Sequence, residues 1–165
     1  MPLDLEAASL VRQKVYSTLN AVDNETENGR IWWNAARELF NKLAQAGTDR
    51  LQFVPFSAAD AVSSPAGIDH GIDAAHQIYM VYAKKRNTAT DAYLKVVDDA
   101  DADSGSTADE KIILALLDGN DEVGVIYPTG LSMANGLVTN STTTVNGETE
   151  NAAADAPDGF YVIGA

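Results

Sequence analysis

The residues of this chain that are best suited to chemistry are the carboxylates of one acidic run. Asp99, Asp101 and Asp103 alternate with other residues, and Glu110 follows at the twelfth position counted from Asp99. Alternating carboxylates are typical of calcium loops, but an EF-hand loop needs Gly at its sixth position, where this chain has Ser104. We therefore interpret the run as a solvated hairpin loop and assign no metal or other cofactor, with calcium binding as the alternative.

The two histidines, His70 and His76, form a second candidate site together with Asp69 and Asp73. Zinc sites on a helix place their histidines four residues apart, and a catalytic histidine needs a nucleophile beside it. The chain has no cysteine and no Gly-x-Ser-x-Gly elbow, and it lacks the glycine-rich fingerprints of nucleotide-binding loops. We interpret these residues as the polar part of a loop, and we predict no catalytic residues and no enzyme.

The charge balance argues against nucleic acid as a partner. The chain has 165 residues, with 11 Lys and Arg against 24 Asp and Glu, which gives a formal net charge of -13. Binding to phosphates requires clustered cations, so an acidic chain is repelled by DNA, RNA and anionic lipid. Hydrophobic residues make up 45% of the chain, as in globular proteins, and no apolar run is long enough to cross a membrane. We expect a soluble, unprocessed protein.

Two segments that precede the loop candidates repeat apolar residues at helical spacing. Apolar residues three and four apart mark one face of residues 3–22 and again of residues 31–44. Asn28 is a suitable N-cap for the second segment, and Gly47 is a suitable C-cap. The pattern predicts a helical hairpin within an N-terminal region of residues 1–50.

From residue 51 onward the apolar period becomes that of strands. Residues 51–76 are predicted to be a linker or loop, in which Pro55 keeps any strand short or at an edge. Short segments rich in Val, Ile and Tyr follow, separated by turn formers. They predict strands at 77–85, 92–98, 111–117, 122–127, 137–144 and 160–163. The predicted fold class is α+β, with two N-terminal helices followed by an antiparallel, jelly-roll-like β-sandwich over residues 77–165.

The apolar faces of the two helices are candidates for contact with a partner. Trp32 and Trp33 are adjacent, so on a helix they point about 100° apart and cannot both face the centre of one core. The stripes can pack inside the chain, or they can meet copies of the chain or another protein. The candidate interface residues are Leu10, Val15, Leu19, Trp32, Trp33, Leu39 and Phe40.

The strand region resembles small bacteriophage virion proteins in the order and character of its segments. The segments that carry the resemblance are 92–100, 111–117, 123–144 and 158–165. In segment 123–144, the run Pro-Thr-Gly-Leu-Ser-Met-Ala-Asn-Gly-Leu leads into a threonine-rich strand, and Asp-Gly-Phe-Tyr-Val-Ile-Gly-Ala closes the chain. The resemblance covers about residues 77–165 and leaves the helices unmatched.

This resemblance implies a capsid decoration or cement protein, which binds without catalysis. The expected partners are the major capsid protein and further copies of the chain in a homo-oligomer, here a trimer, with no nucleic acid and no membrane. The expected location is the capsid surface of a virion assembled in the host cytoplasm. The alternative is a carbohydrate-binding or host-attachment module on a head fibre or tail.

Overall fold

The computed structural model describes residues 5–21, 27–46, 51–57, 68–86, 90–100, 110–117, 121–145 and 155–164. Two helices, α1 (Leu5–Ala21) and α2 (Glu27–Ala46), come first in this part of the chain. Eight strands follow: β1 (Gln52–Phe56), β2 (Ile68–Asp69), β3 (His76–Lys84), β4 (Ala92–Val97), β5 (Glu110–Leu116), β6 (Glu122–Met133), β7 (Val138–Thr142) and β8 (Asp158–Gly164). The predicted α+β class is confirmed.

The strands form two four-stranded sheets in which every pairing is antiparallel. Sheet A has the order β1-β8-β3-β6, and sheet B has the order β2-β7-β4-β5. In both sheets, strands far apart in the sequence are neighbours, so the C-terminal strand β8 lies between β1 and β3. The C-terminal strand therefore joins the first strand of the chain to the centre of sheet A.

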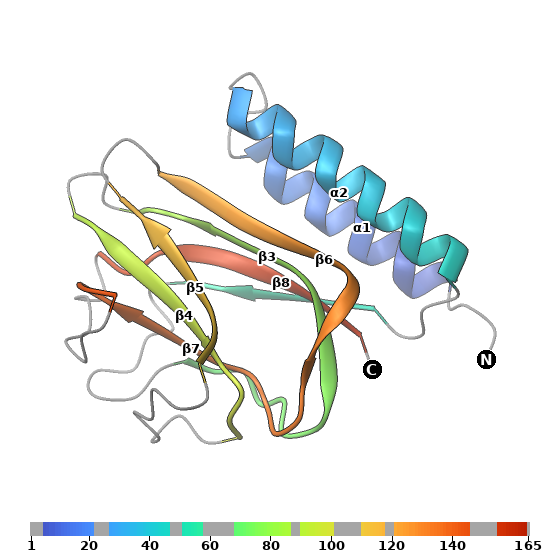
Figure 1. The fold of residues 1–165 in the computed structure, drawn as a ribbon. Coiled ribbons are helices and arrows are strands. Elements are labelled where there is room, and N and C mark those ends of the chain that lie inside the picture. Colours follow the sequence, from blue (N-terminus) through green and yellow to red (C-terminus); the bar gives the residue numbers. More distant parts are fainter. Residues whose placement is uncertain are drawn as a thin grey trace.

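The elements lie in three layers, with sheet A in the middle (Figure 1). One apolar cluster lies between the helices and sheet A, and it includes Val15, Leu39 and Phe160. A second cluster lies between the two sheets, and it includes Ile78, Leu94 and Tyr161. Sheet A is therefore apolar on both faces, which explains the continuous burial of β3 and β8.

An irregularity in the pairing of β3 changes which of its side chains point into each of the two apolar clusters. The register with β6 and with β8 shifts between Ile78 and Met80. Ile78 and Val81 belong to the core between the sheets, whereas Tyr79 and Met80, although adjacent, both belong to the helix-facing core. A β-bulge has this effect because one extra residue resets the alternation of side chains between the two faces.

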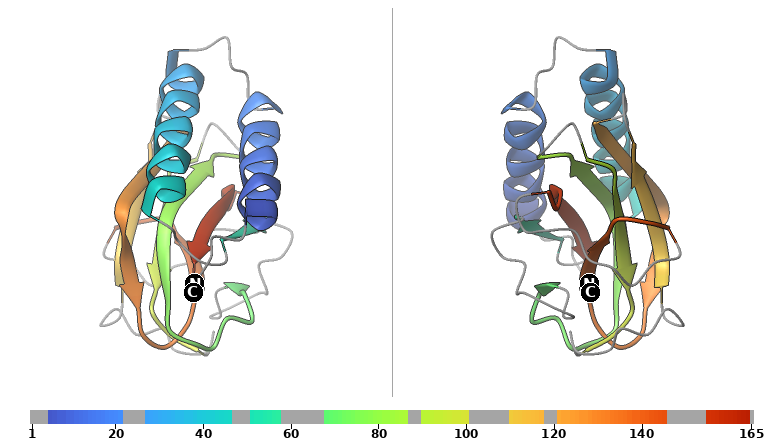
Figure 2. Two further views of the ribbon diagram at one scale, coloured as in Figure 1. Left: turned by 90° about the vertical axis from the view of Figure 1, so that its right-hand side faces the viewer. Right: turned by 90° about the vertical axis from the view of Figure 1, so that its left-hand side faces the viewer.

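The helices cover the outer face of sheet A, with α1 beside β1 and α2 beside β6 (Figure 2). The Trp32 ring meets the ring of Tyr82 edge-on, with 6.1 Å between centroids. It also lies so close to Gly124 on β6 that a Cβ atom there would be 3.0 Å from two of its ring carbons. The missing side chain of Gly124 thus makes the space that the indole occupies.

Most of the predicted strands match observed ones to within a residue or two, and β1 is an edge strand, as Pro55 predicted. Two differences concern the extent of the sheets. First, β1 and β2 fall within residues 51–76, where we expected a linker, and they pair with β8 and β7. Second, β6 continues past Pro128 to Met133, because it is an edge strand on which a missing N–H group is tolerated.

Candidate functional site

The candidate interface residues separate into buried and exposed side chains. Val15, Leu39 and Phe40 are buried between the helices and sheet A, which is the alternative in which the helix faces pack inside the chain. Trp32 is half-buried on sheet A, and Leu10 on α1 remains 56% exposed. Leu19 and Trp33 lie within α1 and α2, but their side chains are outside the described residues.

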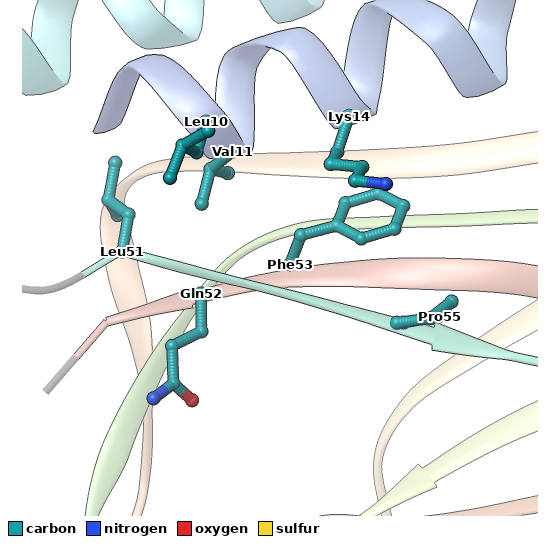
Figure 3. Close-up of a pocket in the computed structure, with 7 residues that line it drawn as sticks. All are labelled: Leu10, Val11, Lys14, Leu51, Gln52, Phe53 and Pro55. Carbon is teal, nitrogen blue, oxygen red and sulfur yellow. The ribbon is translucent and has the colours of Figure 1, made fainter. Parts of the chain in front are cut away.

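Leu10 lies at the rim of a groove between α1 and the edge strand β1. The groove encloses about 530 Å³. Its lining residues are Leu10, Val11, Lys14, Leu51, Gln52, Phe53 and Pro55. Figure 3 shows Phe53 pointing from β1 toward α1, with Lys14 directed toward its ring, while Gln52 points away from the helix.

The backbone of β1 explains why this groove is open. Side chains alternate along a strand, so Phe53 and Pro55 face the helix layer while Val54 and Phe56 face sheet B. On its other edge β1 has no partner strand among the described residues, and Pro55 lacks the N–H that such a strand would need. The open side of the groove is therefore a surface for side chains rather than for an added strand.

The helix layer differs in charge from the rest of the chain. The two helices carry five of the eleven Lys and Arg but only three of the 24 Asp and Glu. All five of these cations, Arg12, Lys14, Arg30, Arg37 and Lys42, are exposed on it. The helix layer is thus the part of this acidic chain that repels other acidic surfaces least.

The two histidines occupy different environments and do not form the cluster that their spacing suggested. The ring of His70 is hydrogen-bonded through Nε2 to the Thr139 hydroxyl at 2.7 Å, and that hydroxyl is also bonded to Tyr161. Burial raises the pKa of the Tyr161 phenol, against a smaller lowering by Thr139, so the phenol stays protonated. His76 is buried, with Nδ1 2.9 Å from the carbonyl oxygen of Ala74. The Thr139 hydroxyl thus links β7 of sheet B with β8 of sheet A, and His70 is bonded to that link.

The acidic run is described only at its ends. Asp101 and Asp103 lie outside the described residues, as does the hairpin loop that we predicted around them. Glu110 begins β5, and its carboxylate accepts a hydrogen bond from the Lys95 ammonium group at 2.8 Å. Within the described residues, no three His, Asp or Glu side chains lie together as a metal site would need. The calcium alternative depends on Asp101 and Asp103 and stays a prediction from the sequence.

Asp98, next to that run, has a structural role that the sequence pattern did not predict. Its carboxylate accepts hydrogen bonds from the backbone N–H groups of Ala134, Asn135 and Gly136, at 2.7 to 3.3 Å. Burial acts to raise the pKa of Asp98, but these three N–H groups and nearby Lys111 outweigh it and lower the pKa overall. Asp98 thus fixes the turn at which the chain passes from sheet A to sheet B.

A second structural feature that the sequence pattern did not predict is a buried lysine. Lys95 lies in the middle of β4 and is 3% exposed, and the side chain of its partner Glu110 is 15% exposed. The available signal was its position between Leu94 and Val96 in a strand whose other residues are apolar. Two charges are removed from water here, which is costly unless they are well paired.

Comparisons with protein-family models, with curated proteins and with solved structures find no match to this chain. No helix in the described ranges combines the length and the apolar character needed to cross a membrane.

Proposed function

We propose that this chain is a viral structural protein that decorates a bacteriophage capsid and stabilises the head by binding the lattice of the major capsid protein. The observation that carries the proposal is the exposed apolar groove between α1 and β1, on the least acidic layer of the molecule. The resemblance of residues 77–165 to small virion proteins supplies the biological setting. In this proposal the helix layer faces the shell and sheet B faces outward.

The groove is suited to holding an apolar side chain of a partner. Leu10 and Ile31, both on the helix layer, are the two most exposed of the large hydrophobic residues in the described part of the chain, at 56% and 53%. Apolar side chains that enter such a surface are removed from water, which contributes about 25 cal/mol per Å² of apolar area. Lys14 at the rim adds a donor for a carboxylate of the partner.

A decoration protein gains strength from repetition. We propose that the chain acts as a homotrimer, so that each trimer contacts several capsid subunits at once. Linking weak sites makes each later contact effectively intramolecular, which raises the overall affinity without stronger single contacts. The acidic surface outside the helices limits association between trimers in solution.

The proposal includes a jelly-roll-like β-sandwich formed by sheets A and B. The shared apolar core between them supports this arrangement, since Val81 and Tyr161 of one sheet pack in the same cluster as Leu94 and Leu116 of the other. The proposal assigns no catalytic role to the histidines, because their hydrogen bonds go to Thr139 and to the backbone of Ala74.

The test is the rebinding of the purified protein to capsids from which it has been removed. We expect Leu10→Asp to reduce the bound fraction at least tenfold, because a carboxylate at the rim must be desolvated on docking. The matched control is Ile113→Asp, which places the same charge at a 41% exposed position on sheet B. We expect the control to bind like the wild type.

Equal binding by Leu10→Asp and the wild type would refute the assignment of the groove. No binding of the wild-type protein to stripped capsids, combined with retention on a glycan array, would favour the attachment module instead. A monomer mass in solution would contradict the trimer.

A further inference from the structure

Three side chains on sheet B form an arrangement that the proposed function does not use. Lys95 lies on β4, Glu110 begins the neighbouring strand β5, and Asn140 lies on β7, on the other side of β4. Together they bring a primary amine, a carboxyl group and a carboxamide into one small region of the sheet.

The strand register places Lys95 opposite Asn140. The two residues are direct partners in the antiparallel pairing of β4 with β7. Residues directly opposite in such a pair point to the same face and have Cβ atoms about 4.5–5.5 Å apart. Because Leu94 and Val96 face the core between the sheets, Lys95 and Asn140 share the opposite face of sheet B. The amine of a lysine can reach the side-chain carbonyl carbon of an asparagine across this separation.

The surroundings of these groups are unusual for polar side chains. Lys95 is 3% exposed, and its ammonium nitrogen is 2.8 Å from Oε1 of Glu110. The Oδ1 atom of Asn140 is buried and has no hydrogen-bond partner among the described residues. An unpartnered buried acceptor is rare in folded proteins and calls for an explanation. One explanation is that Oδ1 of Asn140 accepts a hydrogen bond only during a reaction at Cγ of the same side chain.

We propose that Lys95 and Asn140 react within the folded chain to form an isopeptide bond, with Glu110 carrying the proton. The proposal is independent of capsid binding, because all three groups belong to one subunit.

The reaction needs no oxidant, reductant or added reactant. A proton first moves from the ammonium group of Lys95 to the carboxylate of Glu110 along their hydrogen bond, which leaves a neutral amine and a neutral acid. The amine lone pair then attacks Cγ of Asn140, a C–N bond forms, and Oδ1 takes the displaced electron pair and accepts a hydrogen bond from the acid.

The intermediate collapses when the Cγ–Nδ2 bond breaks. The departing nitrogen receives one proton from the former lysine nitrogen and one from Glu110, so that it leaves as ammonium and Glu110 returns to a carboxylate. One amide has then replaced another, and a covalent bond joins β4 to β7.

The test is the mass of the intact wild-type protein and its tryptic peptide map. We expect a mass lower than that of the sequence by one ammonia, and one peptide in which Lys95 is joined to Asn140. Trypsin should fail to cleave after Lys95 but should cleave after Lys111, which lies on the adjacent strand and is 40% exposed.

Matched variants separate the reaction from folding. We expect Glu110→Gln and Asn140→Ala to have the masses of their sequences, with circular dichroism spectra like that of the wild type, whereas Lys111→Arg should still lose ammonia. A folded wild-type protein with the full mass of its sequence and complete cleavage after Lys95 would overturn the proposal. Loss of ammonia in Asn140→Ala would overturn it as well.

Discussion

Removing the Asp98 carboxylate tests whether this one side chain stabilises the turn that connects sheet A to sheet B. Asp98 follows β4, and its carboxylate oxygens accept hydrogen bonds from three successive backbone N–H groups in the turn between β6 and β7. The Asp98→Ala variant leaves those three donors without their acceptor. Gly136 is buried, so water cannot replace the lost bond there, whereas Ala134 and Asn135 are exposed and can be rehydrated.

These contacts give the size of the effect. A hydrogen bond to a charged group contributes about 1.5–3 kcal/mol, and an unsatisfied buried donor costs about 1–3 kcal/mol. With one donor left buried and two rehydrated, we expect Asp98→Ala to lower the free energy of unfolding by about 3 kcal/mol. In a domain of this size that change lowers the melting temperature by roughly 6–12 °C. The Asp98→Asn variant keeps one acceptor oxygen but loses the charge, so its cost should be about 2 kcal/mol.

The pH dependence gives a second measurement of the same interaction. The pKa of Asp98 is lower in the folded protein than its usual value of 3.8. A carboxyl group of this kind stabilises the fold above its unfolded pKa, and the contribution is lost as the pH falls through the folded pKa. The difference in stability between the wild type and Asp98→Asn should therefore be full at neutral pH and should shrink as the pH falls below 3.8.

The assay is urea unfolding followed by circular dichroism, at neutral pH and at acidic pH. The matched control is Glu38→Gln, which removes a 68% exposed carboxylate that forms an ion pair with Lys42, four residues away, at 2.9 Å. That helical pair is worth about 0.3–0.5 kcal/mol. The reasoning is refuted if Asp98→Ala costs no more than the control, or if the difference between the wild type and Asp98→Asn is the same at both pH values.

Two further predictions concern close packing on sheet A. Trp32→Ala should lower the free energy of unfolding by about 2 kcal/mol, because it empties the half-buried space over Gly124. The control is Ile31→Ala, at a 53% exposed neighbouring position, which should change the free energy of unfolding by no more than about 0.5 kcal/mol. Equal losses in the two variants, measured by urea unfolding, would contradict the packing of the indole. Gly130→Ala should cost more than the roughly 1–2 kcal/mol of a left-handed backbone alone, because φ is +80° and the new Cβ would meet Gln77. Gly71→Ala, with φ +64° and open space around it, is the control, and an equal loss of thermal stability in the two variants would contradict the contact with Gln77.

Local periodicity explains the success of the element predictions. The steps of three and four that mark Val11, Val15 and Leu39 require a helix, and the alternation along Leu94 to Val97 requires a strand, because side-chain direction follows from the backbone within a few residues. Pro55 likewise restricts β1 to an edge without reference to any other part of the chain. These features needed only the order of neighbouring residues.

The candidate site depended on contacts between distant segments. The apolar period of α1 does not distinguish Val15, which sheet A buries, from Leu10, which faces the groove, since only the position of β1 separates them. The strand pattern around Lys95 likewise gives no sign that Glu110 and Asn140 lie on either side of it. Strand neighbours are chosen by burial and register over the whole chain, so the order of residues determined the elements of this protein, and tertiary packing alone decided which side chains it buries, pairs or leaves open.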